Sequence, residues 1–439
     1  MSDFGDYFLQ LALAFGAGSV AMACLLLLLL RRAIVNIYDP LAVQALMLLA
    51  PYITGYTLFP VFQQAMTPSY WLILFFLATF LAVISLIPVP RTAFTEVRLP
   101  TGYLRIILAV VIAIDVLSFC VNVLGSGGGI PLFSEAGSAG RFEATTNSRL
   151  LTWLSFGTNG TPLLIYALSE DRGVRRFALA AFLLECLIGI LFAGKGAILQ
   201  PVFLLLTCMF VARARGDDIL LRRYKSILRY GGVALIALVP MYLLFSLRGA
   251  SLSDLPLILG IRFFGGFDQL LPAALNNMAQ DPSVQSDLHL NLLQYQFMPF
   301  FKAAFGINPT YSSIGQYLVA YVTGQVIEGP FTFPNSNLIL ETMFTSGNGL
   351  GYVLYLSELL IFYFVRRRAL SRPVTPGSLL ALKVTVFSPL SMFLSGQEYF
   401  TTLVISAFIL WGCYALWVLV RKEPGKAVAV ASVPGGATA

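Results

Sequence analysis

The stretch Leu25-Leu26-Leu27-Leu28-Leu29-Leu30-Arg31-Arg32 decides the fold class of this chain. Its leucines are apolar on every side of a helix, and such a surface suits the hydrocarbon core of a bilayer, which about 20 apolar residues can cross. Similar runs recur along the 439 residues, of which 58% are apolar and only 11% charged. Soluble domains carry roughly 25% charged residues. The composition excludes a soluble globular enzyme and predicts an all-α polytopic membrane helix bundle.

We predict about 11 transmembrane spans, with roughly 10–14 as the range, in a single membrane domain over residues 1–439. The first run has Asp3 and Asp6 before it and two arginines after it, which is the reverse of a secretory signal peptide. We therefore expect a retained anchor with its N-terminus outside. The expected spans lie at 7–30, 40–62, 70–90, 106–124, 151–168, 177–194, 197–212, 231–246, 347–365, 377–395 and 400–420.

The basic residues support this alternation. Of the 28 Lys and Arg residues, 21 fall in loops that the alternation places on one side, and Lys383 falls near the same end of its span. Cytoplasmic loops of membrane proteins carry such an excess of positive charge. We therefore predict a cytoplasmic C-terminal tail at 421–439. The net charge of +7 is explained first by topology, so no nucleic-acid partner is expected.

Two stretches are expected on the outer face, a Gly/Ser-rich loop at 125–150 and a long segment at 247–346. The positive-inside rule disfavours Lys and Arg residues in these outer stretches or at the outer ends of spans. Such residues also cost free energy where they face lipid. They are solvated charges, ion-pair partners or ligands of an anion. Several converging Arg side chains suit a diphosphate, because each offers a planar fork of donors. The six outer bases are Arg141, Arg149, Lys195, Arg248, Arg262 and Lys302.

Glycines surround one of these bases and fill the first outer loop. Lys195 stands in Ala193-Gly194-Lys195-Gly196, where flanking glycines permit close approach of a ligand or form a tight turn. Successive Gly and Ser amides in the 125–150 loop can form an anion-binding nest. A soluble phosphate-binding loop is excluded because its glycine-lysine signature does not occur.

This layout resembles the bacterial oligosaccharide repeat-unit polymerases, the Wzy-type O-antigen polymerase family. The resemblance covers roughly residues 120–365 and depends on the arrangement of five stretches more than on one motif. They are Gly129-Ile-Pro-Leu-Phe-Ser134 leading into Arg141; Phe192-Ala-Gly-Lys-Gly196; Leu247-Arg248-Gly249; Arg262-Phe-Phe-Gly-Gly-Phe-Asp268; and Pro334-Asn-Ser-Asn337 followed by Glu341 and Gly347-Asn-Gly-Leu-Gly351.

The resemblance implies a C-type glycosyltransferase-like membrane enzyme with a large outer-face loop region. It implies transfer of a growing glycan from undecaprenyl diphosphate to another lipid-linked repeat unit, at the outer face of the bacterial inner membrane. Expected partners are the lipid-linked donor and acceptor, the bilayer and a chain-length regulator. The polymer would be an O-antigen, a capsule or an exopolysaccharide.

Candidate site residues follow from this chemistry. Departure of a diphosphate develops negative charge that preorganised Arg groups can stabilise. Asp268 and Glu143 are candidate bases, although each can instead be the ion-pair partner of a nearby Arg. No metal is expected, because no cluster has metal-ligand spacing, and no cofactor is expected. The catalytic candidates are Arg141, Arg248, Arg262, Asp268 and Glu143, and the substrate-binding candidates are Arg149, Lys195, Asn335, Asn337 and Glu341.

Two other functions remain open. An O-antigen ligase also uses a lipid-diphosphate donor, but the only histidine, His289, has Asn291 after it without the later Gly of that family. A flippase or transporter needs ionisable groups near mid-membrane. The carboxylates well inside spans are Asp115, Glu185 and Glu358. No matched pair of interrupted hydrophobic segments is evident, which counts against a transporter.

Overall fold

The structure is a computed structural model that describes residues 2–63, 66–126, 129–133, 149–192, 200–231, 270–284, 292–305, 311, 314–324, 337–388 and 396–421. Within these ranges the chain is helical, and its only extended pairing is an isolated bridge between Val97 and Val374. The helices are α1 (Ser2–Leu30), α2 (Pro40–Gln44), η1 (Ala45–Leu49), α3 (Ala50–Gln63), α4 (Pro68–Leu86), α5 (Thr101–Ser126), α7 (Arg149–Thr158), α8 (Thr161–Leu168), α9 (Arg172–Leu191), α10 (Gln200–Arg215), α13 (Leu270–Leu275), η5 (Met278–Gln280), α15 (Leu292–Phe305), α16 (Ile314–Thr323), α17 (Leu338–Ser346), α18 (Asn348–Leu370), α19 (Pro376–Leu382), η6 (Lys383–Phe387) and α21 (Gly396–Arg421).

The all-α class and the membrane character are confirmed, but the count of 11 spans is not. Among the described residues, six helices are long and apolar enough to cross a bilayer. Each overlaps a predicted span. The other predicted spans correspond to the shorter pair α7 and α8, to α9, to α10 and to α19 with η6, while 231–246 lies almost wholly outside the described residues.

Helix starts follow ordinary capping chemistry. The side chain of Thr67 accepts a hydrogen bond from the Tyr70 amide at 3.2 Å, and Pro68 occupies the first turn of α4. Asp171 caps α9 by accepting from the Val174 amide at 2.7 Å. Such caps satisfy amides that have no partner inside the helix.

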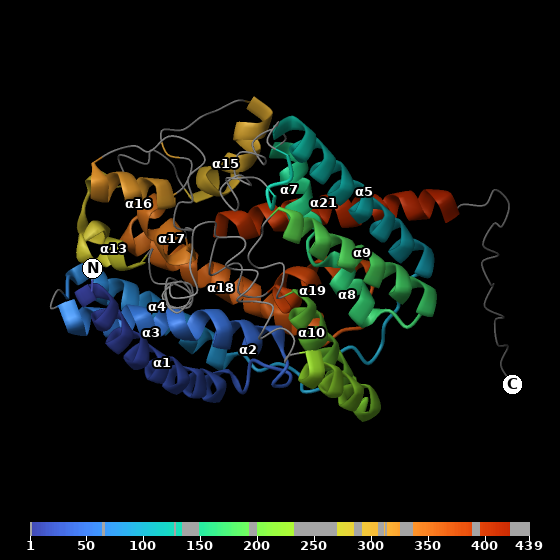
Figure 1. Cartoon of the computed structure of the whole chain (residues 1–439), viewed down its shortest axis with the longest axis horizontal. Coiled ribbons are helices and arrows are strands. Elements are labelled where there is room, and N and C mark those ends of the chain that lie inside the picture. Colours follow the sequence, from blue (N-terminus) through green and yellow to red (C-terminus); the bar gives the residue numbers. More distant parts are fainter. Residues whose placement is uncertain are drawn as a thin grey trace, which may run out of the picture.

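Figure 1 shows where the short helices of the predicted outer segment lie relative to the end of α21. In Figure 1, α13 and α16 lie at the left, at the same end of the view as the start of α1, while α21 ends at the right. Basic residues occupy the last turns of α18 and α21. The short helices of the predicted outer segment therefore lie at the end of the bundle away from the Arg421 end of α21.

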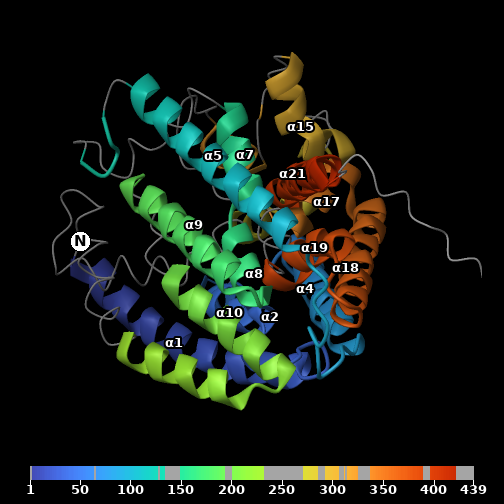
Figure 2. The same ribbon diagram turned by 90° about the vertical axis from the view of Figure 1, so that its right-hand side faces the viewer.

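In the described part of the chain, the buried apolar side chains form two main cores. One joins α1, α3, α4, α17 and α18 with α13 and α16. The other joins α5, α8, α9, α10, α19 and α21. Figure 2 shows α5, α9 and α10 on one side of the molecule and α4 and α18 on the other.

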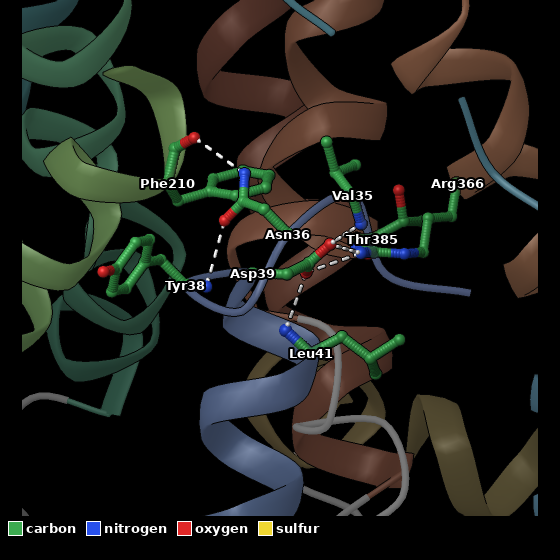
Figure 3. A network of polar contacts seen from close by, with 8 residues as sticks. All are labelled: Val35, Asn36, Tyr38, Asp39, Leu41, Phe210, Arg366 and Thr385. Carbon is green, nitrogen blue, oxygen red and sulfur yellow. Dashed lines mark hydrogen bonds and ion pairs between the residues drawn. The ribbon is translucent and has the colours of Figure 1, made fainter. Parts of the chain in front are cut away.

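A buried ion pair joins α2 and α18 of the first core, and a further hydrogen bond from it reaches η6 of the second core (Figure 3). Asp39, the N-cap of α2, meets Arg366 near the end of α18, with Nη2 2.6 and 2.7 Å from its carboxylate oxygens. Both side chains are fully buried. Arg366 also donates to the Thr385 carbonyl of η6 at 2.8 Å, and Asp39 accepts from the amides of Val35 and Leu41. The pair thus links three helical segments at one point.

Candidate functional site

The described residues contain a buried polar cluster at a break between α7 and α8. We predicted one continuous span at 151–168, but the helix stops at Thr158 and restarts at Thr161. Gly160 has a φ of +71°, a left-handed conformation that glycine adopts without steric cost. Pro162 then occupies the first turn of α8 and cannot donate to the turn before it. The break leaves backbone groups of Gly157 and Gly160 available inside the bundle.

Lys383 uses one of these groups. It lies at the start of the π-helical η6, is 3% exposed, and donates to the Gly157 carbonyl and to Thr161 Oγ1, the latter at 2.8 Å. Ser406 of α21 donates to the same carbonyl at 2.8 Å. π-Helical turns frequently occur at functional sites. Side chains of η6 and α21 therefore meet at the C-terminal end of α7, beside Thr161 of α8.

The close approach of α7 and α21 depends on Gly157. A Cβ at this position would stand 2.8 Å from Ile405 Cβ and closer still to its Cγ2. No side chain fits there without displacement of one helix. The glycine thus lets α21 bring Ser406 to the broken end of α7.

Asp115 supplies a carboxylate from the middle of α5. It is 5% exposed and accepts hydrogen bonds from Ser155 and Thr158 of α7, both at 3.1 Å. Its charge also interacts with that of Lys383. The polar line continues along α5, where Asn122 donates to Ser118 at 3.3 Å.

Glu185 of α9 supplies the second carboxylate. Both of its oxygens are buried, and neither has a hydrogen-bond partner among the described residues. The Gly160 amide at the start of α8 lies near it without completing a hydrogen bond. Glu185 interacts electrostatically with Asp115 and Lys383. The nearby N-terminus of α8 favours a negative charge on Glu185, but burial of the carboxylate disfavours that charge more strongly.

The charge balance indicates what the cluster can do. Two carboxylates face one ammonium, so full ionisation leaves an uncompensated negative charge inside the bundle. Such a charge is costly at this depth. The cluster is therefore chemically suited to take up and release one proton or one small cation.

Most predicted site residues lie outside this region. Arg149 begins α7, but its side chain is not among those described. The structure therefore does not show whether the candidate Arg residues converge. Those lying outside the described residues are Arg141, Glu143, Lys195, Arg248, Arg262, Asp268 and Asn335.

Asn337 and Glu341 are described, and both are buried. Asn337 caps α17 by accepting from the Leu340 amide at 3.0 Å, and its Nδ2 donates to Tyr52 Oη at 2.5 Å. Glu341, in the first turn of α17, is fully buried and packs against Gly396 at the start of α21. The positions of both are explained by helix capping and packing, and their role in substrate binding stays a prediction.

The sequence identified Asp115, Glu185 and Glu358 as carboxylates inside spans. It did not predict that Asp115 and Glu185 lie together with Lys383. Glu358 accepts instead from Gln296 of α15, at 3.2 Å. Lys383 was assigned to the inner end of its span. A signal for the break was present, because Asn159-Gly160 is a turn dipeptide and is followed by Thr161-Pro162. Among the described residues, no group of His, Cys, Asp and Glu has the arrangement of a metal site.

No protein-family model, curated protein or solved structure matches this chain.

Proposed function

We propose that the chain is an oligosaccharide repeat-unit polymerase of the lipid-diphosphate-dependent class, located in the bacterial inner membrane with about 11 spans. The observation that carries the proposal is the retention of six bases, four of them Arg, on the side where the charge rule disfavours them. The family resemblance supplies the reaction, which is transfer of a glycan from undecaprenyl diphosphate to another lipid-linked unit.

The arrangement of the described helices supports this proposal. Helices α13 and α16 belong to the long segment at 247–346, and they lie at the end of the bundle away from the Arg-bearing end of α21. Under the positive-inside rule that end faces outward. A substrate carried on an outer-leaflet lipid would meet the protein there.

The chemistry assigned to the bases is electrostatic. Cleavage of the bond between the glycan and the diphosphate leaves negative charge on the departing phosphate, and Arg forks can hold that charge in a partly dehydrated site. Arg141, Arg248 and Arg262 are assigned to this work. Asp268 or Glu143 accepts the proton of the acceptor hydroxyl.

The test uses purified protein and synthetic lipid-diphosphate repeat units, with a glycan ladder as the readout. Replacement of any one of the three Arg residues by Ala should lower the rate roughly thirty- to a thousandfold, equivalent to about 2–4 kcal/mol. Lys replacements should recover only part of this, because they lose the fork. Arg222→Ala, in the basic 213–229 stretch, is the matched control and should polymerise normally. Full ladders from all three Ala variants would reject the proposal.

A second candidate function is transport of a lipid-linked or soluble glycan coupled to protons or cations. The observation that favours it is the cluster of Asp115, Glu185 and Lys383 at the α7–α8 break. Interrupted helices at mid-membrane depth are where transporters bind coupling ions and substrates.

The two functions are separated by one pair of variants. In proteoliposomes, Glu185→Gln should abolish proton-coupled glycan movement if the chain is a transporter and leave the polymerisation ladder intact if it is a polymerase. Glu358→Gln is the control, since that carboxylate is also intramembrane but contacts Gln296. Loss of the ladder in Glu185→Gln, without loss of folded protein, would instead place the cluster in the polymerase reaction.

A further inference from the structure

A cavity of about 260 Å³ lies between α8, α9, α10 and the helical residues 218–231. Arg175, Arg215, Ser169 and Tyr224 are part of its wall. It adjoins the last turn of α10, which carries Arg213 and Arg215. None of these residues belongs to the Lys383 cluster or to the predicted outer site.

Arg175 is held in the cavity wall by aromatic groups. Its guanidinium carbon lies 4.9 Å from the centre of the Tyr166 ring, and its Nη2 donates to the Tyr224 hydroxyl at 3.0 Å. Among the described residues it has no carboxylate partner within ion-pair distance. Stacking and one neutral hydrogen bond fix the guanidinium while leaving its charge uncompensated.

Arg215 supplies the second guanidinium and is only partly paired. Its Nη1 donates to Glu170 at 3.3 Å and its Nη2 to the Leu168 carbonyl at 3.1 Å. Its Nε is buried without a partner in the described part of the chain. Glu170 is 77% exposed, so solvent screens that ion pair.

Asp217 also lines the cavity, and its carboxylate accepts the Leu220 amide at 3.0 Å. Glu170 and Asp217 both interact with Arg215, whereas Arg175 has no carboxylate within ion-pair distance in the described part of the chain. The cavity is suited to an acceptor-rich anion.

We propose that this cavity binds a phosphate group. Arg175 and Arg215 would offer guanidinium donors and Ser169 a hydroxyl, which is the donor set that phosphate oxygens prefer. Basic pockets between membrane helices on the cytoplasmic side are also sites for anionic lipid headgroups. The same chemistry accommodates a phospholipid headgroup or free phosphate.

The test measures thermal stability of the purified full chain with two probes, since a ligand that binds the folded state raises the melting temperature. One probe is phosphatidylglycerol in phosphatidylcholine nanodiscs, compared with phosphatidylcholine alone. The other is inorganic phosphate added to protein in detergent. Stabilisation by phosphatidylglycerol alone identifies a lipid headgroup, and stabilisation by inorganic phosphate identifies free phosphate. Either result supports the proposal.

The variants decide whether the cavity is responsible. Arg175→Gln should weaken binding of the active probe at least about tenfold, because a charge-assisted contact is lost. Arg213→Gln is the control, since that exposed Arg contacts Asp218 outside the cavity, and should bind as the original chain does. If Arg175→Gln does not fold, Arg175→Lys keeps the charge and should still bind more weakly. No stabilisation by either probe, or equal binding by the folded Arg175 variant and the original chain, would overturn the proposal.

Discussion

At the residue scale, the Asp39–Arg366 pair shows how a buried charge is tolerated. Asp39 has two backbone amides as well as the guanidinium, and Arg366 has the Thr385 carbonyl. Removing both ions from water is expensive, and only good geometry with further hydrogen bonds offsets that cost. We therefore interpret the pair as a fixed point between the helix groups.

Asp39→Asn should destabilise the folded protein by about 3–5 kcal/mol, because it leaves the Arg366 charge buried and unpaired. Thermal unfolding in detergent measures this. Glu96→Gln is the control, since Glu96 pairs with Arg98 at an exposed site, and should change stability by less than about 1 kcal/mol. A melting temperature for Asp39→Asn as high as that of the control would show that the pair contributes little.

At the element scale, the α7–α8 break shows how a helix that looks continuous by apolar content is interrupted by turn residues. The break places a carbonyl and a helix N-terminus beside Lys383 and Glu185. Gly157 lets α21 pack closely on this broken end of α7 and bring Ser406 to the Gly157 carbonyl. The packing of α21 and the chemistry of the cluster are therefore coupled.

Gly157→Ala should separate these two helices and cost about 1–3 kcal/mol of stability, as overpacking of a core does. The cost should fall in an Ile405→Ala background, because most of the obstructing side chain is then gone, and unfolding of all four proteins measures the coupling. Gly412→Ala on α21 meets nothing within 4 Å and serves as the control. Equal costs for Gly157→Ala in both backgrounds would contradict the predicted contact.

At the whole-molecule scale, much of the fold could be predicted from the sequence. The length of an apolar run indicates how much helix can cross a bilayer, and each of the six span-length helices in the described part of the chain overlaps a predicted span. The grouping of side chains could not be predicted, because run length carries no information on which distant segments meet. Arg366 was thus interpreted as an inside loop charge, although it is fully buried.

The candidate site was predictable only in part for the same reason. The outer Arg residues were selected by their position against the charge rule, and that argument does not depend on contacts. Lys383 was identified as a base near one end of a span, but its contact with Gly157 depends on a break that apolar content does not reveal. Asn159-Gly160 was the local signal that could have revealed it.

The same charge distribution predicts the orientation of the whole molecule. Green fluorescent protein fused after Gly216 should fluoresce, because the basic stretch at 213–229 is expected in the cytoplasm, whereas alkaline phosphatase fused after Gln285 should be active, because that position is expected outside. Fusions of the opposite reporter at each site are the controls. Fluorescence of the fusion after Gln285 would reverse the orientation and remove the outer bases from the reach of the proposed substrate.

The pairing of Asp39 with Arg366 can form only late in the synthesis of the chain. The two residues are 327 positions apart, and a ribosome adding roughly 5–20 residues per second needs about 16–65 seconds to synthesise the chain between them. Throughout that interval the first helices are in the membrane while the guanidinium that will neutralise Asp39 does not yet exist. Until α18 has been synthesised, the hydrogen bonds from the Val35 and Leu41 amides are the contacts of Asp39 that lie close to it in sequence.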